Sequence, residues 1–194
     1  TNVLNMLNAR YFVIPNGQGG TTVQRNVAAL GNAWFVDNYK IVDNPNEEIL
    51  ALNDFNPSST AIINKEYASV VEGKDLTLDS NSVIVMEHQE PYHPDYLKYN
   101  TNTSKEQLAV FSEIHYAPDW RAYMDGKPAE YIRVNYVLRA MVIPAGKHVI
   151  EFKNEAPLLH KLDKVAWIGS AIFALIIIGA IVLHFHKKEE KSHS

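Results

Sequence analysis

The sequence predicts an all-β domain, an antiparallel β-sandwich of jelly-roll-like type with minor helix, followed by one C-terminal transmembrane α-helix. Short runs rich in β-branched and aromatic residues alternate with turn residues through most of the 194-residue chain, which is typical of a sandwich. Apolar and polar residues alternate most densely over 107–152. One long run, 165–185, contains no Asp, Glu, Lys or Arg, as a membrane span requires.

The N-terminal half of the domain is predicted to hold short strands and one helix. The helix is expected over 46–53, where Asn44 or Asn46 can cap the first turn. Glu47 and Glu48 then lie at the helix N-terminus, where acidic side chains are favourable. Strands are expected over four apolar, β-branched or aromatic runs that turn residues bound: 11–14, 33–42, 59–64 and 82–87.

The C-terminal half of the domain carries the main strands of the predicted sandwich. Asp125-Gly126 is a strong hairpin signal, because both central positions of a type I′ turn need a positive φ angle. The stretch 131–143 follows as one long strand or two, and Pro144-Ala-Gly146 turns the chain again. Strands that follow one another through tight turns indicate antiparallel pairing.

The run 165–185 is long enough to cross a bilayer, since it covers about 30 Å as a helix. Trp167 lies near one end, where an interfacial aromatic residue is expected. Ala166, Ser170 and Ala174 are spaced by four and form a stripe of small residues on one face. Such a stripe lets helices pack closely, although Ala and Ser are also common in membrane helices in general.

The chain divides into four predicted parts: a segment 1–32, a β-sandwich domain 33–160, the transmembrane helix 165–185 and a short basic tail 186–194. Three lysines follow the helix and two precede it, so the positive-inside rule favours a cytoplasmic tail and an extracytoplasmic domain. The chain lacks an initiator Met and an export signal. We therefore expect a fragment of a longer protein, in which 1–32 leads from an upstream membrane part into the domain.

Composition and motifs exclude several classes of function. The chain has no cysteine, so disulfides, thiolate nucleophiles and Cys-ligated metals are absent. A formal net charge of -4, with no cluster of Lys and Arg before residue 160, argues against nucleic-acid binding. No phosphate-binding loop, dinucleotide motif or serine-hydrolase motif is present. We expect no cofactor and identify no catalytic residue.

The stretch 87–95 carries two histidines and three carboxylates, which are possible metal ligands. His88 and His93 lie five residues apart and would point to opposite faces of a strand. Pro91 and Pro94 make a helix implausible. We therefore interpret 87–95 as a polar loop and expect no metal site.

The candidate glycan-binding residues gather around the predicted hairpin. Aromatic rings beside hydrogen-bonding groups suit a sugar, whose apolar face stacks on a ring. The alternative is that Tyr116 and Trp120 fill the core and Asp125-Gly126 only turns the chain. The candidates are Tyr116, Trp120, Tyr123, Arg133 and Arg139.

The same region resembles the C-terminal region of the YfhO family of bacterial multi-pass membrane proteins. The resemblance rests on Phe111-Ser-Glu113, Tyr116, Trp120-x-Ala122-x-x-Asp125-Gly126, Asn135-Tyr-x-x-Arg139 and Pro144-Ala-Gly-x-His148. Further matches are Leu7-Asn8-x-x-Tyr11, Ala29-Leu-Gly31-x-Ala33-Trp-Phe-Val36 and Tyr92-x-Pro94-x-Tyr96-Leu97. Their order and spacing cover nearly the whole chain, and the final apolar helix with its basic tail fits the end of the family.

The resemblance implies a role in a polytopic glycosyltransferase that takes sugar from a polyprenyl-phosphate carrier. Catalytic acidic residues would lie in the upstream membrane part, so no catalytic residue carries over to this chain. The chain would be an extracytoplasmic module with the last helix of the cell membrane protein. Its expected partners are the bilayer, the upstream transmembrane helices, and envelope glycan or lipid-linked sugar.

Two roles remain open for such a module: acceptor or glycan recognition, and structural capping of the membrane helices. Two further alternatives do not depend on the resemblance. One is a membrane-anchored carbohydrate-binding module. The other is a membrane-anchored glycoside hydrolase, which needs two carboxyl groups about 5–9.5 Å apart in a cleft.

Overall fold

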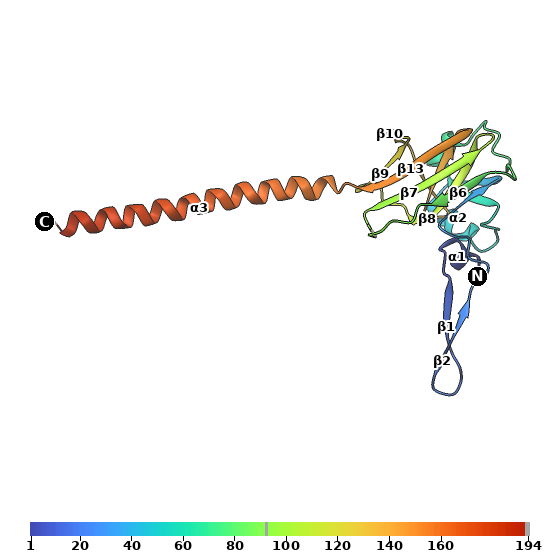
Figure 1. The fold of residues 1–194 in the computed structure, drawn as a ribbon, viewed down its shortest axis with the longest axis horizontal. Helices are drawn as coiled ribbons and strands as arrows, with labels where there is room; N and C mark the ends of the chain where they lie inside the picture. Colours follow the sequence, from blue (N-terminus) through green and yellow to red (C-terminus); the bar gives the residue numbers. More distant parts are fainter. Residues whose placement is uncertain (92, 193–194) are drawn as a thin grey trace. The chain divides into compact units, whose positions relative to one another are not determined.

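The computed structural model confirms an all-β fold with minor helix and one C-terminal apolar helix (Figure 1). It describes residues 1–91 and 93–192, with 157–161 and 181–192 as backbone alone. Tyr92 of the resemblance and the last two residues of the predicted tail 186–194 lie outside the described residues. Contacts divide the chain into two compact units, Thr1–Asn154 and the part from Glu155 onward.

One layer of the sandwich is a five-stranded, fully antiparallel sheet. In spatial order its strands are β10 (Lys127–Ala129), β9 (Trp120–Met124), β13 (Gly146–Asn154), β7 (Tyr96–Thr103) and β6 (Val83–Met86). The β9–β10 hairpin turns at Asp125 and Gly126, whose φ angles are 52° and 76°. These angles confirm the turn that the sequence predicts there.

The other layer is a six-stranded sheet. In spatial order its strands are β3 (Ala33–Val36), β8 (Gln107–Ile114), β12 (Leu138–Ile143), β11 (Ile132–Val134), β5 (Thr60–Asn64) and β4 (Asn38–Val42). The pair β4–β5 is parallel and every other pair is antiparallel. The chain between β4 and β5 contains helix α2 (Pro45–Ala51), where a helix over 46–53 is predicted. Of the two predicted caps, Asn44 caps the helix and accepts from the Glu47 backbone N–H at 3.0 Å.

The main hydrophobic core lies between the two sheets. Tyr99 on β7, Phe111 on β8 and Phe152 on β13 are fully buried there. Their rings meet edge to face, with the Tyr99 and Phe111 centroids 4.9 Å apart and those of Phe111 and Phe152 5.0 Å apart. Such aromatic contacts add about 0.5–1.5 kcal/mol per pair beyond the burial of area, so they bind the sheets to each other.

A second core covers the other face of the six-stranded sheet. Leu108 and Val110 on β8 point into this core, whereas their neighbours Ala109 and Phe111 point into the first. The covering side chains include Met6 of helix α1 (Asn2–Met6) and Leu76. The 3₁₀ helix η1 (Lys65–Val70) supplies further contacts. The six-stranded sheet is therefore buried on both faces, whereas the two cores cover only the inward face of the five-stranded sheet.

Strands β1 (Tyr11–Pro15) and β2 (Thr21–Arg25) form a separate antiparallel hairpin. Figure 1 shows this hairpin extending away from the sheets of the same unit. The sequence predicts a strand at 11–14, and β1 confirms it. Strand β2 contains no run of apolar residues, so the sequence pattern does not predict it.

Helix α3 runs from Pro157 to Ser192. Its stretch Leu162–Ala180 has a mean hydropathy of 1.8. Among the described residues it is the one helix long and apolar enough to cross a membrane. The boundaries proposed from the sequence for the membrane segment, 165–185, and for the sandwich, 33–160, stay predictions.

Candidate functional site

The five residues that the sequence singles out do not converge on one site. Strand β9 separates two of them, because successive side chains point to opposite faces. Trp120 points inward on the side of Ala122 and Met124, and Tyr123 points outward. Tyr116 is 53% exposed in the loop between β8 and β9.

Trp120 and Arg139 meet inside the sandwich. The guanidinium carbon of Arg139 lies 4.2 Å from the Trp120 ring centroid and 4.9 Å from that of Phe152. Arg139 is 2% exposed, and its Nε donates to the Ile114 carbonyl at 2.9 Å. Its NH1 group has no hydrogen-bond partner among the described residues. The two rings therefore provide much of the environment of this cation.

The groups around Arg139 have shifted pKa values. Burial raises the pKa of Glu113, and the nearby Arg139 cation opposes that shift. Burial lowers the pKa of His115, with help from Arg133 and Arg139. A raised carboxyl pKa suits a general acid, but glycoside hydrolysis needs a second carboxyl group beside the first. The charge that acts on Glu113 is the Arg139 cation and not a second carboxylate. This favours a structural role for the cluster around Arg139.

Arg133 lies opposite Arg139 in the β11–β12 register but bonds elsewhere. It forms ion pairs with Glu48 at 3.2 Å and with Glu66 at 3.4 Å, and its NH1 donates to the Tyr136 carbonyl at 2.9 Å. Glu48 is fully buried and accepts from the Tyr136 backbone N–H at 2.8 Å. Tyr136 has a φ angle of 71°, so this network holds a strained turn in place.

Tyr123 belongs to a group on the outward face of the five-stranded sheet. The Lys153 ammonium on β13 lies 5.0 Å from the Tyr123 ring centroid and 5.6 Å from that of Tyr96 on β7. Both distances are within the range of a cation–π contact. Glu151 bonds to Lys153 at 3.2 Å and accepts from the Tyr96 hydroxyl at 2.5 Å. A single carboxylate therefore fixes one ring and the cation.

The strand register brings these side chains together. Lys153 is paired with Tyr96 and Glu151 with Lys98 across β13 and β7, and Glu151 is paired with Tyr123 across β13 and β9. Alternate residues of neighbouring strands share a face. We call this outward-facing group the tyrosine face: Tyr96, Lys98, Asn100, Tyr123, Glu151 and Lys153.

Glu87, just after β6, borders the tyrosine face. Its carboxylate pairs with Lys98 at 2.9 Å and accepts from the Asn100 amide at 3.2 Å. The Lys98 hydrogen bond lowers the pKa of Glu87, and the Tyr96 hydroxyl lowers that of Glu151. Burial raises the pKa of Tyr96 to about 12. This face therefore presents phenol rings, lysine side chains, carboxylates and an amide.

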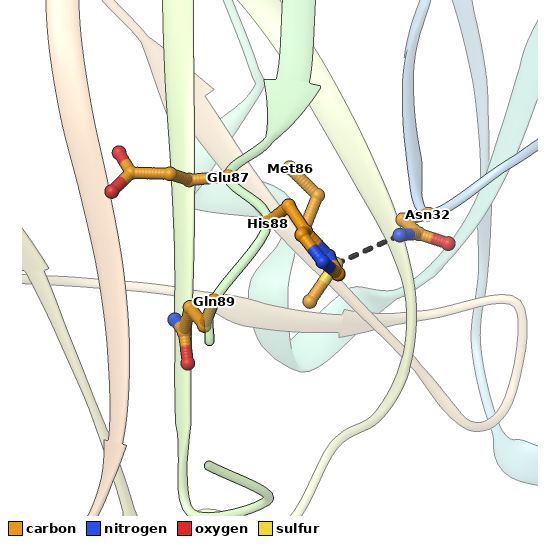
Figure 2. Close-up of a pocket in the computed structure, with 5 residues that line it drawn as sticks. All are labelled: Asn32, Met86, Glu87, His88 and Gln89. Carbon is orange, nitrogen blue, oxygen red and sulfur yellow. Dashed lines mark hydrogen bonds between the residues drawn. The ribbon is translucent and has the colours of Figure 1, made fainter. Parts of the chain in front are cut away.

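A pocket of about 260 Å³ adjoins Glu87 at the edge of the sandwich. Figure 2 shows Glu87 pointing away from Asn32, whose side-chain amide donates to the Met86 sulfur at 2.7 Å. Both polar atoms of the Gln89 amide are buried without a hydrogen-bond partner among the described residues. His88 pairs at 3.0 Å with Glu90, and both side chains are largely exposed. Among the described residues no three His, Cys, Asp or Glu side chains group as metal ligands.

Sequence reasoning missed Tyr96 and Lys153 as members of one face with Tyr123. For Tyr96 the available signal is the alternation in β7, where Leu97, Tyr99, Thr101 and Thr103 are buried. That alternation places Tyr96 on the outward side.

Comparison with protein-family models, with curated proteins and with solved structures finds no match. The resemblance to the YfhO family therefore stays a prediction from the sequence motifs. The site is interpreted from its own geometry.

Proposed function

We propose that this chain is a membrane-anchored, non-catalytic β-sandwich module that binds glycan on its tyrosine face. The observation that carries the proposal is the pair of phenol rings held around the Lys153 ammonium on an open sheet face. Tyr96 and Tyr123 are both partly exposed. The rings come from two strands with β13 between them.

This arrangement suits a sugar for chemical reasons. The apolar face of a pyranose stacks on a phenol ring, whose C–H and π surface is exposed to it. Lysine and carboxylate groups beside the rings hydrogen-bond to sugar hydroxyls, and charge assistance strengthens such bonds. Because the carboxylates are already fixed by Lys98 and Tyr96, little ordering remains to be done on binding.

The cellular context of the proposal comes from the sequence. A candidate membrane span at Leu162–Ala180 is consistent with an anchored module. The resemblance to the YfhO family implies a module outside the cell membrane, in a glycosyltransferase that uses polyprenyl-phosphate-linked sugar. In that setting the tyrosine face contributes recognition of the acceptor glycan, and the chemistry belongs to the upstream membrane part.

The proposal is tested by binding measurements on the full chain in lipid nanodiscs. Oligosaccharides prepared from bacterial envelope polysaccharides are titrated against the wild type, Tyr123→Ala and Tyr116→Ala. Each variant removes one tyrosine ring, and Tyr116 lies in the β8–β9 loop, outside the strands that form the tyrosine face. We expect Tyr123→Ala to weaken binding about tenfold, the equivalent of roughly 1.4 kcal/mol of lost stacking, and Tyr116→Ala to leave it unchanged.

Two results count against the proposal. Absence of binding at millimolar oligosaccharide supports the structural cap instead. Binding that Tyr116→Ala abolishes and Tyr123→Ala leaves intact moves the site to the β8–β9 loop.

A further inference from the structure

The β1–β2 hairpin is an exposed apolar element without a partner in the described structure. Every residue of its two strands is exposed except Phe12, which is half-buried. Val13 is 66% exposed and its cross-strand neighbour Val23 is 64% exposed. A lone two-stranded hairpin is marginally stable in water, so this one requires something to cover it.

Apolar side chains occupy both faces of the hairpin. Val13 and Val23 share one face by cross-strand pairing, whereas Phe12 and Ile14 lie on the other by alternation. A protein surface covers one face of a ribbon. A ribbon that enters the boundary between headgroups and acyl chains brings apolar side chains of both faces into contact with lipid.

The hairpin is also the basic end of an acidic chain. The first 36 residues contain Arg10 and Arg25 and no Asp, Glu or Lys, although the chain carries a formal net charge of -4. Both arginines line an open pocket of about 450 Å³ at the base of the hairpin, together with Tyr11 and Asn26. Among the described residues the Arg25 side chain makes no hydrogen bond or ion pair, so its guanidinium is available for an anion.

The base of the hairpin is anchored to the sandwich unit. The Asn26 amide donates to the Asn5 side chain at 2.9 Å and to the Ala9 carbonyl at 2.8 Å. The Asn26 backbone N–H donates to the Arg10 carbonyl at 2.8 Å. Helix α1, which contains Asn5, buries Met6 in the core. The hairpin is thus built into the unit.

We propose that the β1–β2 hairpin docks in the headgroup region of an anionic lipid bilayer. Its arginines bind lipid phosphates, and Val13, Ile14 and Val23 enter the boundary between headgroups and acyl chains. Tyr11, 62% exposed at the hairpin base, suits that interface. The unpaired strand edges keep the hairpin out of the hydrocarbon core, where backbone groups need partners.

The chain itself supplies a reason for a bilayer rather than another occupant. Only Glu155 and Ala156 separate β13 from helix α3. An α3 that spans a bilayer therefore tethers the sandwich unit to that bilayer, which raises the effective concentration of lipid at the hairpin. This inference is independent of glycan binding on the tyrosine face.

The test uses a nitroxide at Val23→Cys, which is the only thiol because the chain has no cysteine. The full chain is reconstituted in nanodiscs of phosphatidylcholine alone or with three parts in ten phosphatidylglycerol. Collision rates with oxygen and with a polar nickel chelate report whether the label meets lipid or water. Asn81→Cys, in an exposed turn of the sandwich unit, carries the control label.

In the anionic bilayer we expect the label at position 23 to gain oxygen accessibility and lose nickel accessibility, and the label at position 81 to stay in water. Arg25→Gln lowers the ratio of docked to undocked hairpin about fivefold, the usual effect of one basic residue at an anionic surface. This variant is expected to leave the fold intact, since the Arg25 side chain makes no hydrogen bond or ion pair among the described residues and the backbone pairing with Tyr11 is kept. High salt also lowers the ratio of docked to undocked hairpin, because it screens the attraction between the arginines and the anionic bilayer.

Three results overturn the proposal. A label at position 23 that stays in water in both bilayers means that the hairpin does not dock. A label shielded from both oxygen and nickel means that protein covers it, such as a second copy. Equal docking with and without phosphatidylglycerol means that docking does not depend on the negative charge of the bilayer.

Discussion

Two cation–aromatic clusters lie on opposite sides of strand β9, and they differ in access to solvent. Inside the sandwich, Arg139 is 2% exposed between the rings of Trp120 and Phe152. On the outward face, Lys153 lies between two partly exposed tyrosines, Tyr96 and Tyr123. The same chemistry stabilises the fold in one cluster and is available to a ligand in the other. The side of the sheet, and hence the place of the residue in the alternation of its own strand, decides which.

The largest expected effect comes from breaking the inner cluster. Trp120→Ala removes the ring that covers the Arg139 guanidinium and opens a cavity beside the main core. We expect a loss of about 2–4 kcal/mol in the free energy of unfolding, below the upper limit for a fully buried ring. Chemical denaturation of the full chain in detergent measures it. If Trp120→Ala lowers the free energy of unfolding by less than Tyr123→Ala does, the structural role of Trp120 is contradicted.

A smaller effect is expected from Arg139→Lys. Lysine keeps the charge but loses the planar group that stacks on Trp120 and the Nε donor to the Ile114 carbonyl. We expect a destabilisation of about 1–2 kcal/mol, the cost of one buried hydrogen bond and the stacking. The same denaturation measurement tests it, with Lys153→Arg on the outer face as the matched exchange, expected to be near neutral.

The outer cluster should respond in binding rather than in stability. Lys153→Met removes the ammonium that lies beside both tyrosine rings and pairs with Glu151. Cation–π contacts at exposed sites contribute about 0.5–1 kcal/mol, so stability changes little. Affinity for envelope oligosaccharides falls several-fold, as isothermal titration would show. A large loss of stability without a loss of affinity would mean that the outer cluster is also structural.

The smallest effect on stability is expected at the pair of His148 and Asp125, whose side chains bond at 2.7 Å outside both clusters. The Asp125 hydrogen bond raises the pKa of His148, and His148 lowers that of Asp125. The stabilisation by His148 is full below its unfolded pKa of about 6.5 and is lost as pH rises through the higher folded value. That by Asp125 is full above about pH 3.9 and is lost as pH falls through the lower folded value.

Stability from this pair is therefore greatest between about pH 4 and pH 6.5. Because Asp125 is half exposed, solvent screening limits the effect to about 0.5 kcal/mol. Thermal unfolding at pH 6 and pH 8 should show a fall that His148→Gln removes. An unchanged pH dependence in His148→Gln would show that other groups cause it.

Local signals in the sequence predicted much of the fold. Asn44 and Glu47 marked the start of α2 because capping depends on neighbouring residues alone. Asp125-Gly126 marked the β9–β10 turn for the same reason. The β4–β5 pair and the second core around Met6 were not predicted, because they depend on contacts between residues far apart in the chain.

The candidate site was less predictable than the fold. Trp120 and Tyr123 both look like binding residues in the sequence. An aromatic residue next to basic residues gives the same sequence pattern whether its side chain points into the core or toward solvent. In β8 the alternation could not tell inside from outside, since Leu108 and Phe111 are buried in different cores. The partners of Tyr123 on the tyrosine face are Tyr96 and Lys153, which lie on other strands and are brought beside it only by the strand register.

The most direct test of this account is hydroxyl-radical footprinting of the full chain in nanodiscs, with and without envelope oligosaccharide. Tyrosine and tryptophan oxidation is read at each ring by mass spectrometry. We predict that the oligosaccharide slows oxidation at Tyr96 and Tyr123 and leaves it unchanged at Tyr116 and Trp120. Protection at Tyr116 and Trp120, with none at Tyr96 and Tyr123, would contradict the assignment of the outward face as the binding face.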